Sequence, residues 1–170
     1  MMRQDPDVAF VGEMRDPRTV SAGVRAAETG HLVFATMHSA NASQAIQRLL
    51  DLFPLAERDM IRKTLSMTLK AIISQVLLPS VKKGVSRVPA IEILLSNPTV
   101  RKLIAEEREA DLPSVIRSCE HEGMQDFTYT LCNLVQDGLV DPKDALFHAP
   151  NKDELKMALK GIRSTSSSIL

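Results

Sequence analysis

The pattern of apolar and polar positions predicts two short strands joined by a helix at the start of the chain. Val8 to Val11 is a continuous apolar run, and His31 to Met37 is a second one. Buried strands of a parallel sheet are apolar on both faces and therefore do not alternate. Between the two runs, Asp16 followed by Pro17 is a typical helix start and Gly30 a typical helix end. The order strand, helix, strand makes the two strands parallel, with a right-handed crossover.

The middle of the chain is predicted as two helices followed by a hairpin. Helices over 41–52 and 55–70 are separated at Pro54, and apolar residues three and four positions apart give the first of them one buried face. Ile72 to Leu78 and Val88 to Leu95 then read as two strands. A polar segment with a Lys-Lys-Gly turn joins them, which is typical of a hairpin.

The remainder of the chain is predicted to be helical. Asn97-Pro98 and Asp141-Pro142 each place a capping side chain before a proline, which is a typical helix start. These patterns divide the chain into an α/β domain over 1–96, a helical module over 97–163 and a flexible, serine-rich tail over 164–170.

Composition narrows the class of function. Lysine and arginine number 21, as do aspartate and glutamate, and there is one tyrosine and no tryptophan. The chain therefore has neither the basic excess nor the stacking side chains expected of a nucleic-acid binder. No apolar run is long enough to span a bilayer and no signal-peptide pattern begins the chain, so we expect a cytoplasmic protein. Cys119 and Cys132 lack the spacing of a metal site and are expected to be reduced thiols.

A carboxylate stands where the first predicted strand ends. Residues 7–16 read D-V-A-F-V-G-E-M-R-D, so the apolar run stops at Gly12 and is followed by Glu13. The carboxyl end of a strand is where open α/β sheets place their chemistry. In nucleotide hydrolases an acid at this place activates the attacking water or holds Mg²⁺ through water. On the pattern alone, the alternative is a solvated carboxylate at a strand end.

The second predicted strand carries a histidine at each end. Residues 29–42 read T-G-H-L-V-F-A-T-M-H-S-A-N-A, with His31 at the start of the strand and His38 at its end. In a regular strand an odd separation, seven residues here, turns two side chains to opposite faces. The two rings are therefore a poor pair for one metal ion, and we expect two separate polar contacts, with His31 structural.

Both stretches resemble motifs of one family. Arg3 to Asp16 resembles the Walker B segment of the secretion-superfamily ATPases, the hexameric motors of type II secretion and type IV pili, and Thr29 to Ala42 resembles their histidine box. A third stretch, T-V-R-K-L-I-A-E from Thr99 to Glu106, is similar to the A-I-R-N-L-I-R-E signature of the pilus-retraction (PilT-like) branch. It departs from that signature at Thr99, Lys102 and Ala105. The short turn from Pro79 to Arg87, where secretion and assembly motors commonly carry a tetracysteine module, also favours the retraction branch.

The resemblance implies an α/β fold, the C-terminal portion of a RecA-like P-loop NTPase core with parallel strands and a hairpin, followed by the helical module. It implies part of a hexameric motor that hydrolyses ATP with Mg²⁺ and retracts type IV pili in twitching motility. Such a motor works at the cytoplasmic face of the inner membrane and contacts a platform protein there. Glu13 and His38 would be catalytic, with Glu13 also holding Mg²⁺ through water. Arg15 would bind the nucleotide, or form a surface ion pair instead, and Arg101 and Glu106 would belong to the partner surface.

One motif of this family does not occur in the sequence. There is no G-x-x-x-x-G-K-[ST], so we expect the P-loop strand and its lysine to lie before Met1 and the chain alone to be inactive. The chain would then be a fragment of a motor or a catalytically inert remnant. A type II secretion, pilus-assembly or DNA-uptake ATPase is the other alternative. Without the P-loop strand, one edge of the strand over 31–37 should lack a neighbour.

The remaining features have simple structural interpretations. A helix that begins at Pro98 should bury one apolar face, formed by Val100, Leu103 and Ile104. The charged run from Glu106 to Asp111 is expected to be a solvated face with i,i+4 pairs. Met60 and Met67 are expected in a helical core.

Overall fold

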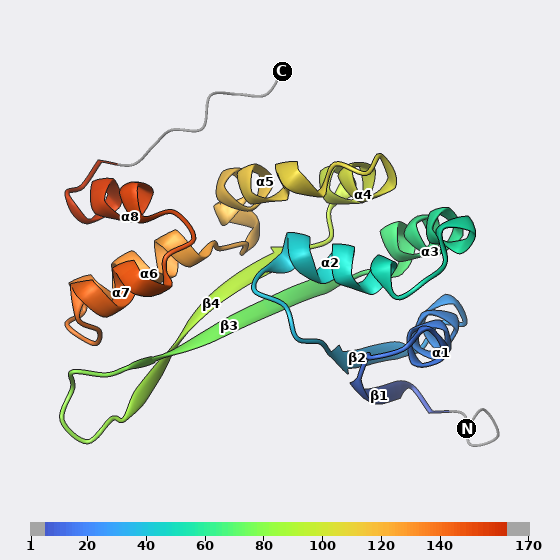
Figure 1. The fold of residues 1–170 in the computed structure, drawn as a ribbon, viewed down its shortest axis with the longest axis horizontal. Coiled ribbons are helices and arrows are strands. Elements are labelled where there is room, and N and C mark those ends of the chain that lie inside the picture. Colours follow the sequence, from blue (N-terminus) through green and yellow to red (C-terminus); the bar gives the residue numbers. More distant parts are fainter. Residues whose placement is uncertain (1–5, 163–170) are drawn as a thin grey trace. The chain divides into compact units, whose positions relative to one another are not determined.

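The computed structural model describes residues 6–162, and Figure 1 shows their helices and strands. The chain groups into two compact units. The first unit contains the chain up to Lys70 together with Ser96–Leu112, and the second contains Ala71–Leu95 together with the residues from Pro113 onward. The units are interleaved along the sequence, so the hairpin groups with the later helices. The predicted boundary at 96/97 would instead divide the chain into two consecutive segments. As a domain boundary it stays a prediction. The expected tail over 164–170 lies outside the described residues.

The first unit begins with the predicted strand, helix and strand. They are β1 (Val8–Glu13), α1 (Pro17–Glu28) and β2 (Leu32–Thr36). The strands pair in parallel, and α1 packs against both of them (Figure 1). The Asp16 side chain starts α1 as predicted, because it accepts a hydrogen bond from the Thr19 backbone N–H at 2.9 Å.

Three further helices belong to the first unit: α2 (Ala42–Asp51), α3 (Leu55–Thr68) and α4 (Pro98–Ala105). A short 3₁₀-helix, η1 (Glu109–Asp111), follows α4. The side chains of Asn41 and Asn97 cap α2 and α4 by accepting hydrogen bonds from backbone N–H groups of their first turns. α3 packs against α1, α2 and α4. The buried apolar residues of these helices are Ala42, Ala45, Ile46, Leu50, Ile61, Leu65, Val100, Leu103 and Ile104.

The expected burial of the three apolar α4 residues is therefore confirmed, but the expectation for two α3 methionines is wrong. Met60 and Met67 are exposed. Each stands next to a buried neighbour, Ile61 or Ser66, and consecutive helix residues point about 100° apart. The buried stripe of α3 runs through these neighbours, which turns both methionines outward.

The second unit is built on the predicted antiparallel hairpin. β3 (Ala71–Pro79) pairs with β4 (Arg87–Leu95) in unbroken register. The helices that follow are α5 (Leu112–Ser118), the 3₁₀-helix η2 (Glu120–Glu122), α6 (Phe127–Gln136), α7 (Pro142–His148) and α8 (Lys152–Leu159). α6 packs against β4 and α8, and α7 packs against β3. Their core consists of Leu78, Val88, Ala90, Phe127, Leu131, Cys132, Val140, Ala145 and Leu155.

One edge of β2 is without a strand neighbour in the part of the chain that the structure describes. Within residues 6–162, β2 pairs with β1 alone, and the hairpin forms a separate sheet. The expected unpaired edge is thus confirmed for these residues. Among the same residues, no helix combines the length and the apolar character needed to cross a membrane.

Candidate functional site

The carboxyl ends of β1 and β2 bring Glu13 and His38 together. β1 ends at Glu13, β2 ends at Thr36, and His38 follows two residues later. Because parallel strands finish at the same edge of a sheet, these ends lie side by side. His38 Nε2 is 3.5 Å from Glu13 Oε1. The histidine side chain is 83% exposed and the glutamate side chain 25%, so the pair faces solvent mainly through the histidine.

A β-bulge at Gly12 sets the position of Glu13. Val11 pairs with Ala35, but the next pair is Glu13 with Thr36, so Gly12 is an extra residue in β1. The Thr36 hydroxyl donates to the Gly12 carbonyl at 2.5 Å, and the Met14 N–H donates to the Thr36 carbonyl at 2.9 Å. The bulge therefore places Glu13, rather than glycine, opposite the last residue of β2. The apolar run predicts that the strand ends at Val11 and carries no bulge, and both expectations are wrong, although a glycine inside a strand often marks a bulge.

Arg15 contacts the other oxygen of the same carboxylate. Its guanidinium forms an ion pair with Glu13 Oε2, and its side chain is mostly exposed. The hydrogen bond from Arg15 is the main cause that holds the pKa of Glu13 below its ordinary value. The charges of Arg15 and His38 act in the same direction, whereas burial opposes them. The surface ion pair expected as one interpretation of Arg15 is thus present, and a role of Arg15 in binding the nucleotide stays a prediction.

The arrangement suits water-mediated chemistry on a phosphate. An ionised carboxylate can orient water or hold Mg²⁺ through water, and the neighbouring imidazole can donate a hydrogen bond to an anion. Within the described residues, no three His, Cys, Asp or Glu side chains gather to hold a metal ion by themselves. A single carboxylate nevertheless fits Mg²⁺, which keeps several waters and takes phosphate oxygens from the substrate.

His31 lies apart from this pair and caps a helix. Its Nδ1 is 3.0 Å from the Ala26 carbonyl oxygen and 3.0 Å from Thr29 Oγ1, both at the end of α1. Gly30, which lies between Thr29 and His31, has a φ of 94°, in the left-handed region that favours glycine. This position fits the structural role that the sequence predicts for His31.

Arg101 and Glu106 occupy the exposed side of α4 and the residue just after it. The Arg101 Nε donates to Ser96 Oγ at 3.3 Å. Glu106 forms ion pairs with Lys102 and Arg108, at 3.9 and 3.6 Å. These partners lie on α4 or beside it, and they do not include Glu13 or His38. In these contacts the predicted signature residues and the predicted catalytic pair are thus not partners of one another.

The charged run after α4 corrects one expectation. Glu109 is buried and contacts Arg62 of α3, although the run was expected to be a solvated face. Arg62 was not among the predicted site residues. The two partners are 47 positions apart, so local charge spacing carries no signal for this contact.

Comparison with known proteins agrees with the resemblance. The sequence pattern of the family described as "Type II/IV secretion system protein" matches residues 1–142. The "Twitching motility protein" of Neisseria gonorrhoeae is 44% identical over 154 residues, which cover 91% of this chain and 41% of that protein. The "Type IV pilus retractation ATPase PilT" of Pseudomonas aeruginosa is 42% identical over 144 residues, which cover 85% of this chain and 41% of that protein.

A solved structure matches in the same way. The crystal structure described as the pilus retraction motor PilT with bound ADP has a TM-score of 0.77 and 45% identity, covering 91% of this chain and 43% of that chain. This match confirms the predicted fold class, part of a RecA-like ATPase core. The chain spans about two fifths of the length of the relatives it matches. Because the family pattern covers most of the chain and close relatives match nearly all of it, the chain belongs to the family of type II/IV secretion system proteins.

Proposed function

We propose that this chain is part of a hexameric, ATP-hydrolysing motor that retracts type IV pili and so drives twitching motility. The observation that carries the proposal is the meeting of Glu13 and His38, 3.5 Å apart, at the carboxyl edge of two parallel strands. Phosphoryl transfer needs groups that position water and phosphate at such an edge. Relatives named for twitching motility and pilus retraction match 91% and 85% of the chain, which supports the retraction branch.

Each side chain of the site has a role in this proposal. The Glu13 carboxylate, ionised beside Arg15, would orient the water that attacks the terminal phosphorus of ATP and would hold Mg²⁺ through water. When bound, Mg²⁺ neutralises negative charge on the phosphate oxygens. The exposed His38 ring stabilises charge on the terminal phosphate. Arg15 orients Glu13, and its guanidinium, on a side chain that is 72% exposed, is accessible to phosphate oxygens beside that carboxylate.

The partner surface of the proposed motor lies on α4. Arg101 and Glu106 are exposed, while three apolar residues on the opposite side anchor the helix. We assign to this surface the contact with a platform protein of the inner membrane, which would hold the hexamer at the cytoplasmic face. An assembly or secretion motor of the same family stays the alternative, as does an inert remnant.

The proposal is tested in a chimera of the gonococcal relative that carries the matching residues of this chain. Glu13→Gln keeps the shape of the side chain and removes its charge, so we expect ATP turnover to be lost while nucleotide binding remains. His38→Ala should reduce turnover less severely. His31→Ala is the matched control, because that ring caps α1, and it should lower Tm without a comparable loss of turnover.

Phosphate release measures turnover, ADP titration measures binding, and twitching of a strain carrying the chimera measures function. Near-normal turnover with Glu13→Gln would make Glu13 a structural residue. An unsubstituted chimera that hydrolyses ATP without restoring twitching would favour the assembly or secretion alternative. One that binds nucleotide but does not hydrolyse it would favour the inert remnant.

A further inference from the structure

Glu109 contacts residues of two helices, α2 and α3. Its carboxylate forms an ion pair with Arg62 of α3, and the glutamate side chain is only 6% exposed. Its backbone carbonyl accepts a hydrogen bond from Ser43 Oγ of α2 at 2.8 Å. A buried charge is tolerated when it is paired and hydrogen-bonded, so both contacts constrain η1 strongly. Glu109, the first residue of η1 after α4, is therefore fixed to α2 and to α3.

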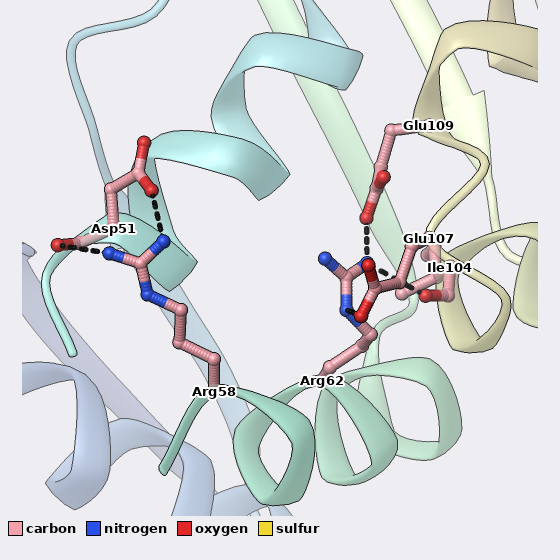
Figure 2. Close-up of polar contacts among 6 residues, drawn as sticks. All are labelled: Asp51, Arg58, Arg62, Ile104, Glu107 and Glu109. Atoms are coloured by element: carbon pink, nitrogen blue, oxygen red, sulfur yellow. Dashed lines mark hydrogen bonds and ion pairs between the residues drawn. The ribbon is translucent and has the colours of Figure 1, made fainter. Parts of the chain in front are cut away.

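Arg62 also contacts the C-terminal end of α4 (Figure 2). Its Nη1 donates to the Ile104 carbonyl at 2.9 Å, and its Nε lies 3.7 Å from Glu107 Oε1. The last carbonyls of a helix lack intrahelical partners and carry the negative end of the helix dipole, which suits a guanidinium. The side chain of Arg62 is 13% exposed, so this contact is largely shielded from solvent.

The end of α4 has a defined and strained shape. The Arg108 N–H donates to the Leu103 carbonyl at 2.9 Å and the Glu107 N–H to the Ile104 carbonyl at 3.4 Å, the two bonds of a Schellman motif. Glu107 consequently has a φ of 60°, a left-handed conformation that is unfavourable for a side-chain-bearing residue. Such strain persists where surrounding contacts enforce it, and Arg62 supplies contacts on both sides of this turn.

The network reaches back toward the Glu13 and His38 pair. Ser43 lies in the first turn of α2, five residues after His38, and Asn41 caps that turn. A short stretch of backbone, the start of α2 and three side-chain contacts thus connect His38 to the end of α4: Ser43 with Glu109, Glu109 with Arg62, and Arg62 with Ile104. All the members of this path belong to the first unit.

Arg58 provides an internal comparison on the same helix. It lies one turn before Arg62 and donates to Asp51 Oδ1 at 2.8 Å (Figure 2). It also donates to the Phe53 carbonyl at 3.0 Å. Its side chain is 32% exposed and that of Asp51 is 64% exposed. This is a surface contact between α2 and α3, and it does not involve α4 or η1.

We propose that Arg62, Glu109 and Ser43 form a coupling joint that carries movement of the Glu13–His38 site to the exposed face of α4. Arg62 and Glu109 are positioning residues in this joint: they bind no substrate but fix Arg101 and Glu106 relative to α2. The proposal rests on the proposed motor function. It predicts that loosening the joint separates ATP hydrolysis from mechanical output.

The test uses the same chimera with Arg62→Lys and, separately, Glu109→Gln. Lysine keeps the charge but cannot reproduce the guanidinium fork that binds carboxylate and carbonyl together. We expect ATPase kcat and KM within about twofold of the parent, twitching reduced at least about tenfold, and a double variant no worse than either single variant. Arg58→Lys is the matched control and should leave both activities unchanged.

Hydrogen exchange of the α4 amides supplies an independent readout. ATP should change α4 protection in the parent chimera and not in Arg62→Lys. Normal twitching in both variants, or a parallel fall of ATPase, twitching and Tm, would overturn the joint, as would an Arg58→Lys chimera that loses twitching equally. If the parent chimera hydrolyses ATP without twitching, the proposed function fails. The coupling joint is then tested by hydrogen exchange alone. If ATP changes the protection of α4 in Arg62→Lys as much as in the parent chimera, the joint is overturned.

Discussion

At the residue scale, the ion pair with Arg15 governs the charge of the candidate catalytic carboxylate. The pKa of Glu13 is lowered chiefly by the Arg15 hydrogen bond, so the group is ionised throughout the neutral range. A carboxyl whose folded pKa is lowered stabilises the fold above its unfolded pKa, about 4.3, and loses that contribution as the pH falls through the folded value. The Glu13–Arg15 ion pair should therefore be insensitive to pH between neutrality and mild acidity.

Arg15→Gln tests this cause directly. We expect the pKa of Glu13, followed by carboxyl carbon NMR, to rise toward its ordinary value, because the main charge-assisted hydrogen bond is gone. His38→Ala should move it less, since the histidine charge is a smaller cause. A Glu13 pKa that is the same with and without Arg15 would contradict the ion pair.

Burial and exposure on α4 predict opposite effects of neighbouring substitutions. Leu103 is buried in the first unit, so Leu103→Ala should lower the free energy of unfolding by about 2–5 kcal/mol. Arg101→Ala is the matched control, because an exposed residue should change it by less than about 0.5 kcal/mol. Urea denaturation of both variants measures the difference. Equal losses would mean that Arg101, too, has a role in packing.

At the scale of elements, the signals that predict structure are the local ones. The Asp16 cap, the left-handed Gly30 and the hairpin turn each depend on a few adjacent residues, and the structure contains all three. Strand alignment is different, because it depends on the neighbouring strand. That is why the bulge at Gly12, and with it the true end of β1, escaped prediction.

Tertiary contacts explain the other differences between the predictions from the sequence and the structure. The charges around Glu109 suggest i,i+4 pairing, but its partner comes from a helix 47 positions earlier, and no periodicity encodes that choice. Met60 and Met67 are apolar, yet the direction of the buried stripe on α3 depends on what packs against it. Glu13 and His38 were predictable as a pair because parallel strands must end at one edge.

At the scale of the whole molecule, the first prediction concerns the nucleotide. Phosphate affinity in P-loop NTPases comes largely from the backbone amides and the lysine of the G-x-x-x-x-G-K-[ST] loop, a pattern that does not occur in this sequence. We therefore expect the isolated chain neither to bind nor to hydrolyse ATP appreciably. Calorimetric titration measures this, with the chimera as the positive control. Binding in the micromolar range would show that the described site holds ATP without that loop.

The last prediction concerns association through the edge of β2. Within residues 6–162 this strand pairs with β1 alone, and its sequence, L-V-F-A-T, has neither a proline nor a charge to block pairing with another chain. One face of the same pair exposes large apolar side chains, with Phe10 75% and Phe34 54% exposed. The isolated chain should therefore associate as its concentration rises, which sedimentation velocity detects. Phe34→Lys should weaken this association by placing a charge on the strand. Phe147→Lys, which replaces a more exposed aromatic (76%) on α7, should not. A chain that stays monomeric at high concentration, or one in which both substitutions act alike, would place the association surface elsewhere.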